Sequence, residues 1–79
     1  MAEHRVFNVW GSDAAGWQVA RRGDTHPLSR HDTHDDAVAE AKRVAELEAP
    51  SEIRVEGADG VVRVEYAYDA DRHLVLGPG

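Results

Sequence analysis

Hydrophobic and polar residues alternate in the first third of the chain in the way that is typical of half-buried strands. Residues 5–10 combine β-branched and aromatic side chains, and residues 17–22 place every second side chain on one face. The intervening residues 11–16 are rich in glycine, serine and aspartate, which favour turns. We therefore predict an antiparallel hairpin. A weaker third strand is predicted over residues 26–31, where Pro27 restricts it to an edge or to its own first residues because proline lacks an amide donor.

The pattern changes to a helical period after Thr33. Apolar residues then recur at three- and four-residue spacing, which predicts one amphipathic helix over about residues 34–48. Thr33 and Asp36 have the spacing of a capping box, with aspartate in place of the usual Glu or Gln. Pro50 is expected to end the helix, since proline disfavours helical geometry in the residue before it.

A second hairpin is predicted after the helix. Side chains alternate in residues 52–56, with Ile53 and Val55 on one face, and the return strand is expected over residues 61–66. Asp59-Gly60 between them is a strong signal for a two-residue turn. In the return strand, strict alternation would place three side chains on one face, namely Val62, Val64 and Tyr66.

The predicted elements follow the order β-β-β-α-β-β in a single small domain spanning residues 1–79. We expect an α+β fold whose antiparallel sheet is covered on one face by the single helix. Its core would lie over about residues 5–68, and residues 69–79 would form a C-terminal tail. The apolar run at residues 74–76 would either add a short strand or fray. One helix leaves the opposite sheet face to water or to a partner.

The composition of the chain excludes or disfavours several functional classes. The chain has 79 residues and no cysteine, so disulfides and thiolate metal sites are excluded. A domain this small gains most from oligomerisation, and we expect a homodimer. The net charge of −6 disfavours contact with nucleic-acid phosphates. The chain contains no apolar run of signal-peptide or membrane-spanning length, so we expect a cytoplasmic protein without membrane partners.

Five short motifs occur in order between Val9 and Asp71. They are Gly16-Trp17-Gln18-Val19; His31-Asp32-Thr33 with Asp36-Ala37-Val38; Ala41 to Ala45; Val55-Glu56-Gly57-Ala58-Asp59-Gly60; and Arg63 with Tyr68 and Asp71. Together these motifs resemble the small bacterial family named domain of unknown function 2188. The chain departs from that pattern near its end, with Ala67-Tyr68-Asp69 for Ser-Tyr-Gly, Arg72 for Pro, and a tail to Gly79. The resemblance implies a compact, strand-rich domain with one helix and no assigned activity.

Three histidines are the first candidates for chemistry. His26, His31 and His34 fall within nine residues, beside Asp32, Asp35 and Asp36. Imidazole and carboxylate groups can bind zinc, but this spacing fits no standard signature. A solvated junction between strand and helix is the favoured interpretation. No cofactor is expected and no catalytic residue is identified, because the hydroxyl residues lack an activating context and no phosphate-binding glycine loop is present.

A second set of candidates could form an interaction surface: Trp10, Trp17, Arg21, Arg22, Tyr66 and Tyr68. Our leading hypothesis is a non-catalytic interaction module that self-associates through an uncovered sheet face or edge, with a further protein partner also expected. The alternative is a nucleic-acid-binding accessory domain, with the two tryptophans stacking on bases and the arginines contacting phosphates. The competing interpretation of Trp17 is that it fills the core under the helix. An enzyme or metal protein based on the histidine and aspartate cluster ranks third.

Overall fold

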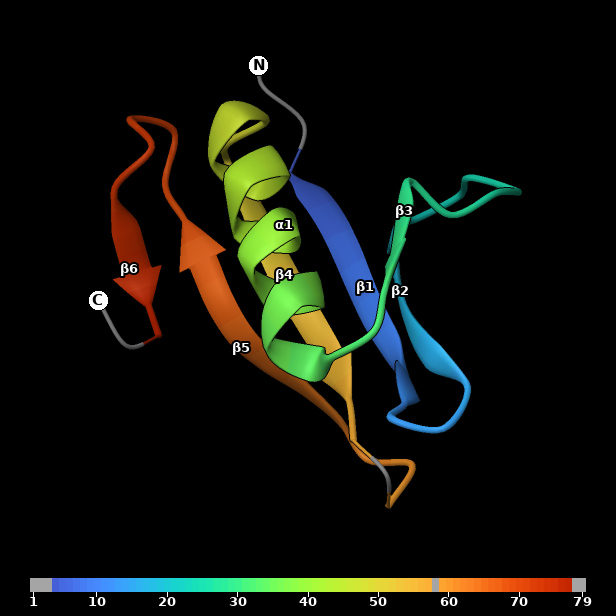
Figure 1. Cartoon of the computed structure of the whole chain (residues 1–79). Helices are drawn as coiled ribbons and strands as arrows, with labels where there is room; N and C mark the ends of the chain where they lie inside the picture. Colours follow the sequence, from blue (N-terminus) through green and yellow to red (C-terminus); the bar gives the residue numbers. More distant parts are fainter. Residues whose placement is uncertain (1–3, 58, 78–79) are drawn as a thin grey trace.

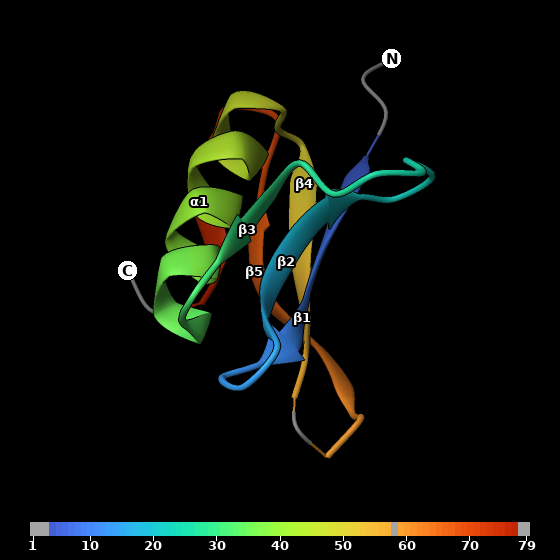
Figure 2. The same ribbon diagram turned by 45° about the vertical axis from the view of Figure 1, so that its right-hand side comes forward.

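The fold has two layers, a mixed sheet and one helix, in a computed structural model that describes residues 4–57 and 59–77 (Figure 1). The elements are β1 (Arg5–Ser12), β2 (Gly16–Arg21), β3 (Ser29–His31), α1 (His34–Leu47), β4 (Ser51–Glu56), β5 (Val62–Tyr68) and β6 (Leu74–Leu76). The sheet has the strand order β3-β2-β1-β4-β5-β6. Figure 2 shows α1 against one face of this sheet, with no described element on the other face.

The predicted α+β class and the order β-β-β-α-β-β are confirmed, and the apolar run near the C-terminus adds the sixth strand. The sheet is mixed rather than wholly antiparallel. β1 and β4 pair in parallel at its centre, while the four other strand pairs are antiparallel. The chain leaves β1 through a hairpin and returns to β4 through α1, so β4 runs in the same direction as β1.

The helix α1 forms where its cap and its apolar period predict it. The Thr33 hydroxyl oxygen accepts a hydrogen bond from the amide of Asp36 at 3.1 Å and so satisfies one free amide of the first turn. The buried face of the helix consists of small residues: Ala37, Val38, Ala41 and Ala45. Small side chains let the helix approach the sheet closely, which suits a two-layer domain of this size.

The core lies between α1 and the central strands. Phe7, Val9, Val19 and Ile53 are fully buried there. The hydroxyl of Ser51, also fully buried, donates a hydrogen bond of 2.6 Å to the carbonyl of Ala45. This bond ties the C-terminal part of α1 to the first residue of β4.

Two connections differ from the sequence-based expectation. The third strand is only Ser29–His31 long, and Pro27 lies before it, so the expected start at residue 26 was wrong. In the second hairpin the amide of Gly57 donates to the carbonyl of Val61 at 3.1 Å. The closing pair is therefore Gly57 and Val61, which makes the loop one residue longer than a two-residue turn. Gly60 adopts a φ of +78° in it, as glycine does in such loops.

The return strand β5 contains a bulge that changes which side chains share a face. Tyr66 pairs with Ile53 and Val64 pairs with Arg54, so Glu65 is an extra residue in β5. The expectation that Val62, Val64 and Tyr66 share a face was therefore wrong. Tyr66 packs against the core on the helix side, and the two valines lie on the other face.

Candidate interaction surface

The sheet face that α1 leaves uncovered, called the open face here, has a central strip of polar and apolar side chains. Strand alternation places Asn8 and Trp10 of β1 on it, opposite Ala20 and Gln18 of β2. From β4 and β5 it receives Glu52, Arg54, Glu56, Val62 and Val64. The open face therefore combines one large aromatic residue with two neighbouring valines, and charged side chains of β4 lie beside them.

The two valines of β5 are among the exposed apolar residues of this face. Val62 is 54% exposed and Val64 is 43% exposed. Val62 also borders a shallow hollow of about 170 Å³, whose other side chains include Asn8, Trp10, Arg54 and Glu56. We call Val62 and Val64 the valine pair. Both side chains are apolar and exposed to solvent, and Val62 lines the same hollow as Trp10.

Arg54, one of the charged residues that line the hollow, is bound by Glu52. Glu52 accepts a hydrogen bond from the Arg54 guanidinium at 2.7 Å, and its other carboxylate oxygen lies 2.7 Å from the His4 ring. The bond from Arg54 lowers the pKa of Glu52 below its ordinary value, and the contact with His4 acts in the same direction against the effect of burial. These contacts fix Arg54 beside the hollow, and Val62 is an apolar residue of its lining.

Two of the predicted surface aromatics belong to the core. Trp17 is 7% exposed and Tyr68 is 6% exposed, and both pack with the buried cluster under α1. The indole nitrogen of Trp17 donates to Asp13 at 3.0 Å, and burial raises the pKa of the Tyr68 hydroxyl. Trp17 and Trp10 therefore lie on opposite sides of the sheet and cannot stack on one ligand.

The arginines of the first half are also separated. Arg21 lies on the helix side, where its guanidinium contacts Glu48 at 2.5 Å and Asp24 at 3.5 Å. The hydrogen bond to Glu48 raises the pKa of Arg21 further above its ordinary value. Arg22 is exposed just beyond the end of β2. Tyr66 is half-buried, with the Lys42 ammonium 4.8 Å from the centre of its ring. The six predicted surface residues therefore do not form one patch.

The three histidines considered as candidate metal ligands also lie in different surroundings. His26 is exposed in the loop before β3, and the ring of His31 contacts the Ser29 hydroxyl at 2.9 Å. The ring of His34 packs edge-on against Trp17, with the ring centres 5.1 Å apart. Of the three histidines, only His34 belongs to the helix, as its first residue.

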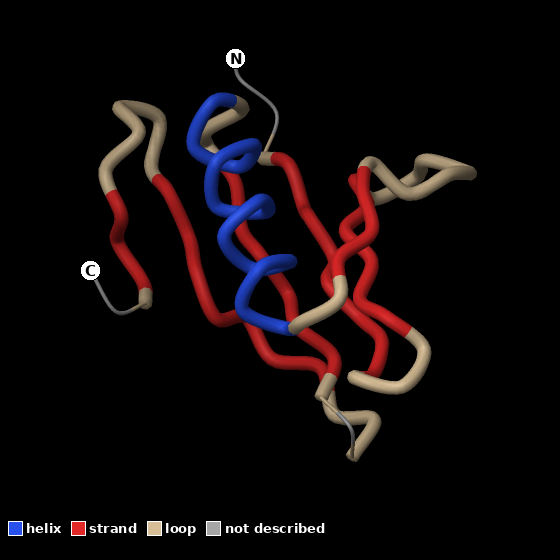
Figure 3. The backbone as a smooth tube through the Cα atoms, in the orientation of Figure 1, coloured by secondary structure: helices blue, strands red, loops and turns tan. Residues whose placement is uncertain are grey.

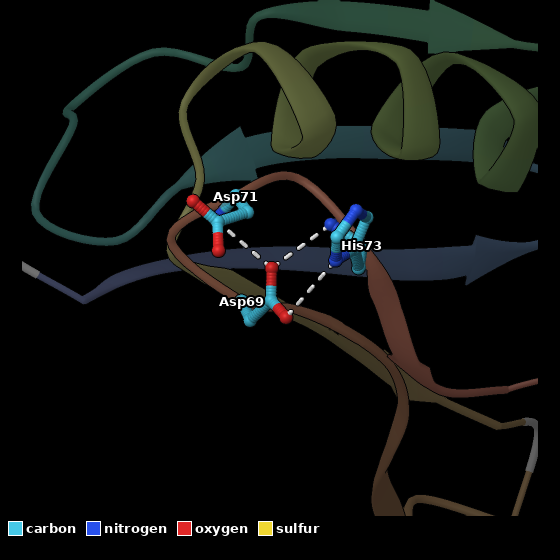
Figure 4. A group of neighbouring side chains, drawn as sticks. All are labelled: Asp69, Asp71 and His73. Atoms are coloured by element: carbon cyan, nitrogen blue, oxygen red, sulfur yellow. Dashed lines mark hydrogen bonds and ion pairs between the residues drawn. The ribbon is translucent and has the colours of Figure 1, made fainter.

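A different group brings potential metal-ligating atoms together, in the turn between β5 and β6. Among the described residues, only the ligating atoms of Asp69, Asp71 and His73 form such a group, all within 4.8 Å of one another (Figure 4). One oxygen of Asp69 accepts hydrogen bonds from the amides of Asp71 and His73, both at 2.9 Å. Its other oxygen lies 3.6 Å from the His73 ring. Asp69 thus closes the turn, and the three side chains remain largely in solvent.

Sequence reasoning missed the valine pair as a surface feature. Strict alternation grouped these valines with Tyr66 on one face, and the bulge at Glu65 places Tyr66 on the opposite side of the sheet from the two valines. The available signal was weak: Val61 and Val62 are adjacent, so one of them must face outward in any strand.

The helix α1 is too short and too polar to cross a bilayer, and no other described helix could do so. Neither the curated proteins nor the solved structures contain a match to the chain. Residues 6–68, from the start of the core in β1 to the end of β5, match the family DUF2188, described as an uncharacterized protein conserved in bacteria. The chain belongs to this bacterial family, the domain of unknown function 2188.

Proposed function

We propose that this chain is a non-catalytic interaction domain that self-associates through the valine pair on its open face. The observation that supports the proposal is the exposure of Val62 and Val64, at 54% and 43%, on the sheet face without a helix. Burying apolar area is favourable by about 25 cal/mol per Å², so a contact that covers both valines gains stability. Val62 lines the same hollow as Trp10, an aromatic residue of the kind enriched at protein interfaces.

The small size of the domain also favours self-association. A chain of 79 residues buries a modest fraction of its surface, and its core here is built largely from alanine and valine. Among the described residues that line the hollow, Glu56 is the only carboxylate and none is a serine, threonine or histidine, while Arg54 is held by Glu52. A binding role therefore fits this surface better than a catalytic one.

Sedimentation velocity over a wide concentration range tests the proposal. We expect the average mass of the wild-type chain to rise with concentration, and Val64→Lys to shift it toward the monomer, because a charge replaces buried apolar surface. The matched control is Leu47→Lys, since Leu47 is 57% exposed but lies at the end of α1. A wild-type chain that stays monomeric at the highest concentration would end the proposal. An equal effect of both variants would show a general gain in solubility instead.

The nucleic-acid alternative has no specific observation in its favour. The two tryptophans lie on opposite sides of the sheet, and the Arg21 guanidinium is held by Glu48. The overall charge of −6 also opposes phosphate binding. We therefore do not propose it as a second function.

A further inference from the structure

A larger hollow, called the helix-side hollow here, lies where α1 meets β5. Figures 1 and 3 show α1 over the central strands, with β5 and β6 continuing past it on one side. The helix-side hollow has a volume of about 370 Å³, and Tyr66 forms its wall on β5. Because Tyr66 packs on the helix side of the sheet, this hollow and the valine pair are on opposite sides. The other wall is one stripe of α1, formed by His34, Asp35, Val38, Ala39 and Lys42.

The apolar walls of the helix-side hollow are held in place by the core. Val38 is 7% exposed and belongs to the core cluster, and Tyr66 packs against the same cluster. Gly77 also lies close to the Tyr66 ring, since an added Cβ at this glycine would come within 2.5 Å of its Cδ1 atom. The hollow is therefore formed by side chains that the fold already positions, and its volume lies at the lower end of the range for small-molecule sites.

Lys42 supplies the positive charge of this hollow. Its ammonium group lies 4.8 Å from the centre of the Tyr66 ring, a cation–π contact that holds it there. Lys42 is half-buried, yet it forms no ion pair with any carboxylate in the described part of the chain. The neighbouring Arg43, in contrast, donates two hydrogen bonds to Glu40, at 2.8 and 2.7 Å. An ammonium group has three N–H donors, so Lys42 keeps donors for an anion.

The other polar groups of the helix-side hollow contact each other. Nδ1 of His34 lies 3.1 Å from a carboxylate oxygen of Asp35. The Asp35 side chain is 98% exposed, so water screens its charge from a ligand that lies against Val38. The ring of His34 packs edge-on against Trp17. Binding in this hollow should therefore change the signal of the Trp17 indole.

We infer that the helix-side hollow binds a small carboxylate with an apolar body. The carboxylate accepts hydrogen bonds from the Lys42 ammonium, and the apolar body covers Val38 and Ala39 beside the Tyr66 ring. An inorganic anion would leave these apolar walls in water, and a purely apolar molecule would leave the ammonium group without a partner. The inference goes beyond the proposed function, because a ligand here does not touch the open face.

Two probes of the same shape test the inference by two-dimensional NMR of the isotopically labelled full chain. Phenylacetate has a carboxylate and an apolar ring, whereas phenylacetamide has the same ring without the charge. We expect phenylacetate to cause saturable shifts of the amide signals of residues 34–42 and Tyr66 and of the Trp17 indole signal. Phenylacetamide should bind about tenfold more weakly, since a hydrogen bond to a charged group is stronger than a neutral one.

Substitution of Lys42 tests the role of its charge. Lys42→Met keeps a long side chain without the charge, so we expect the affinity for phenylacetate to fall about tenfold or more and that for phenylacetamide to change little. Lys42→Arg keeps a cation and should retain most of the affinity. Arg43→Met is the matched control, because it removes one positive charge from the same helix at a residue that does not line the hollow. Ala39→Phe fills the hollow from an exposed position and should weaken both probes.

Several results would overturn the inference. Equal losses of phenylacetate affinity in Lys42→Met and Arg43→Met would show a response to net charge alone. Equal affinity for phenylacetate and phenylacetamide would show that the charge has no role, and shifts confined to Trp10 and Val62 would place the probe on the open face. A spectrum that phenylacetate leaves unchanged up to its solubility limit would also exclude this site. An acidic peptide that then saturates the same signals would identify a protein segment as the occupant. Self-association is measured separately, by the sedimentation experiment.

Discussion

At the scale of single residues, Gly11 is the position where the fold depends most on the absence of a side chain. It has a φ of +143° at the end of the β1–β2 hairpin, and an added Cβ would lie 2.1 Å from the carbonyl oxygen of Gly16. Gly23 also has a positive φ, of +91°, but nothing lies within 4 Å of its Cβ position. Comparing alanine substitutions at these two glycines therefore separates the free-energy cost of backbone strain from that of a steric clash.

We predict that Gly11→Ala destabilises the domain by about 3 kcal/mol or more, because strain and clash act together. Gly23→Ala should cost about 1–2 kcal/mol, from strain alone. Urea unfolding of both variants, followed by circular dichroism, gives the comparison. Equal losses in the two variants would show that the hairpin opens to accept a side chain at residue 11.

At the scale of elements, α1 depends on local signals that one substitution can remove. The Thr33 hydroxyl oxygen accepts the hydrogen bond from Asp36 that satisfies an amide of the first turn. We predict that Thr33→Ala lowers the free energy of unfolding by about 1 kcal/mol, the usual effect of losing such a cap. Thr25→Ala, in the exposed loop before β3, is the control and should change stability little. If the free energy of unfolding of Thr33→Ala fell by less than the experimental error, packing against the sheet and not the cap would determine where this helix begins.

The elements that could be predicted from the sequence are those whose signals are local. The helix and the first hairpin were found to within about two residues, because caps, turns and periodicity act over a few neighbouring positions. Pro27 indicated in part that the third strand is short, because proline restricts a strand to an edge or to its first residues. The parallel pairing of β1 with β4 was not predictable in this way, because it depends on which strand the chain meets after α1.

The candidate surface shows the same limit. The sequence suggested that one sheet face stays free, and the structure has that free face. It did not reveal which residues lie there, because the bulge at Glu65 arises from how β5 lies against β4. One extra residue separates the valine pair, which lies on the open face, from Tyr66, which packs on the helix side. Such a shift follows from the period of two in a strand.

At the scale of the whole molecule, acidic groups tie distant parts of the chain together. Glu48, the C-cap residue of α1, binds Arg21 of β2 and lies 3.4 Å from Arg5 at the start of β1. Glu52 of β4 binds Arg54 and lies next to His4. Five of the nine basic residues take part in ion pairs, some of them local: Arg5, Arg21, Arg43, Arg54 and Arg63. The stability of the fold should therefore depend on pH on the acidic side.

The pKa of Glu52 determines the direction in which the stability changes with pH. The hydrogen bond from Arg54 holds its pKa below the ordinary value of 4.5 in the folded chain, so the unfolded chain binds a proton more readily. Its contribution to stability is complete well above pH 4.5 and is lost as the pH falls through and below that value. We predict that the free energy of unfolding decreases between pH 6 and about pH 3, measured with urea at a protein concentration that favours the monomer.

Glu52→Gln should flatten this decrease, whereas Glu56→Gln, at an exposed position of the same strand, should leave it nearly unchanged. An unaltered pH profile in Glu52→Gln would place the acid-sensitive contact elsewhere, with Glu40 as the next carboxylate to replace, since Arg43 lowers its pKa in the same way.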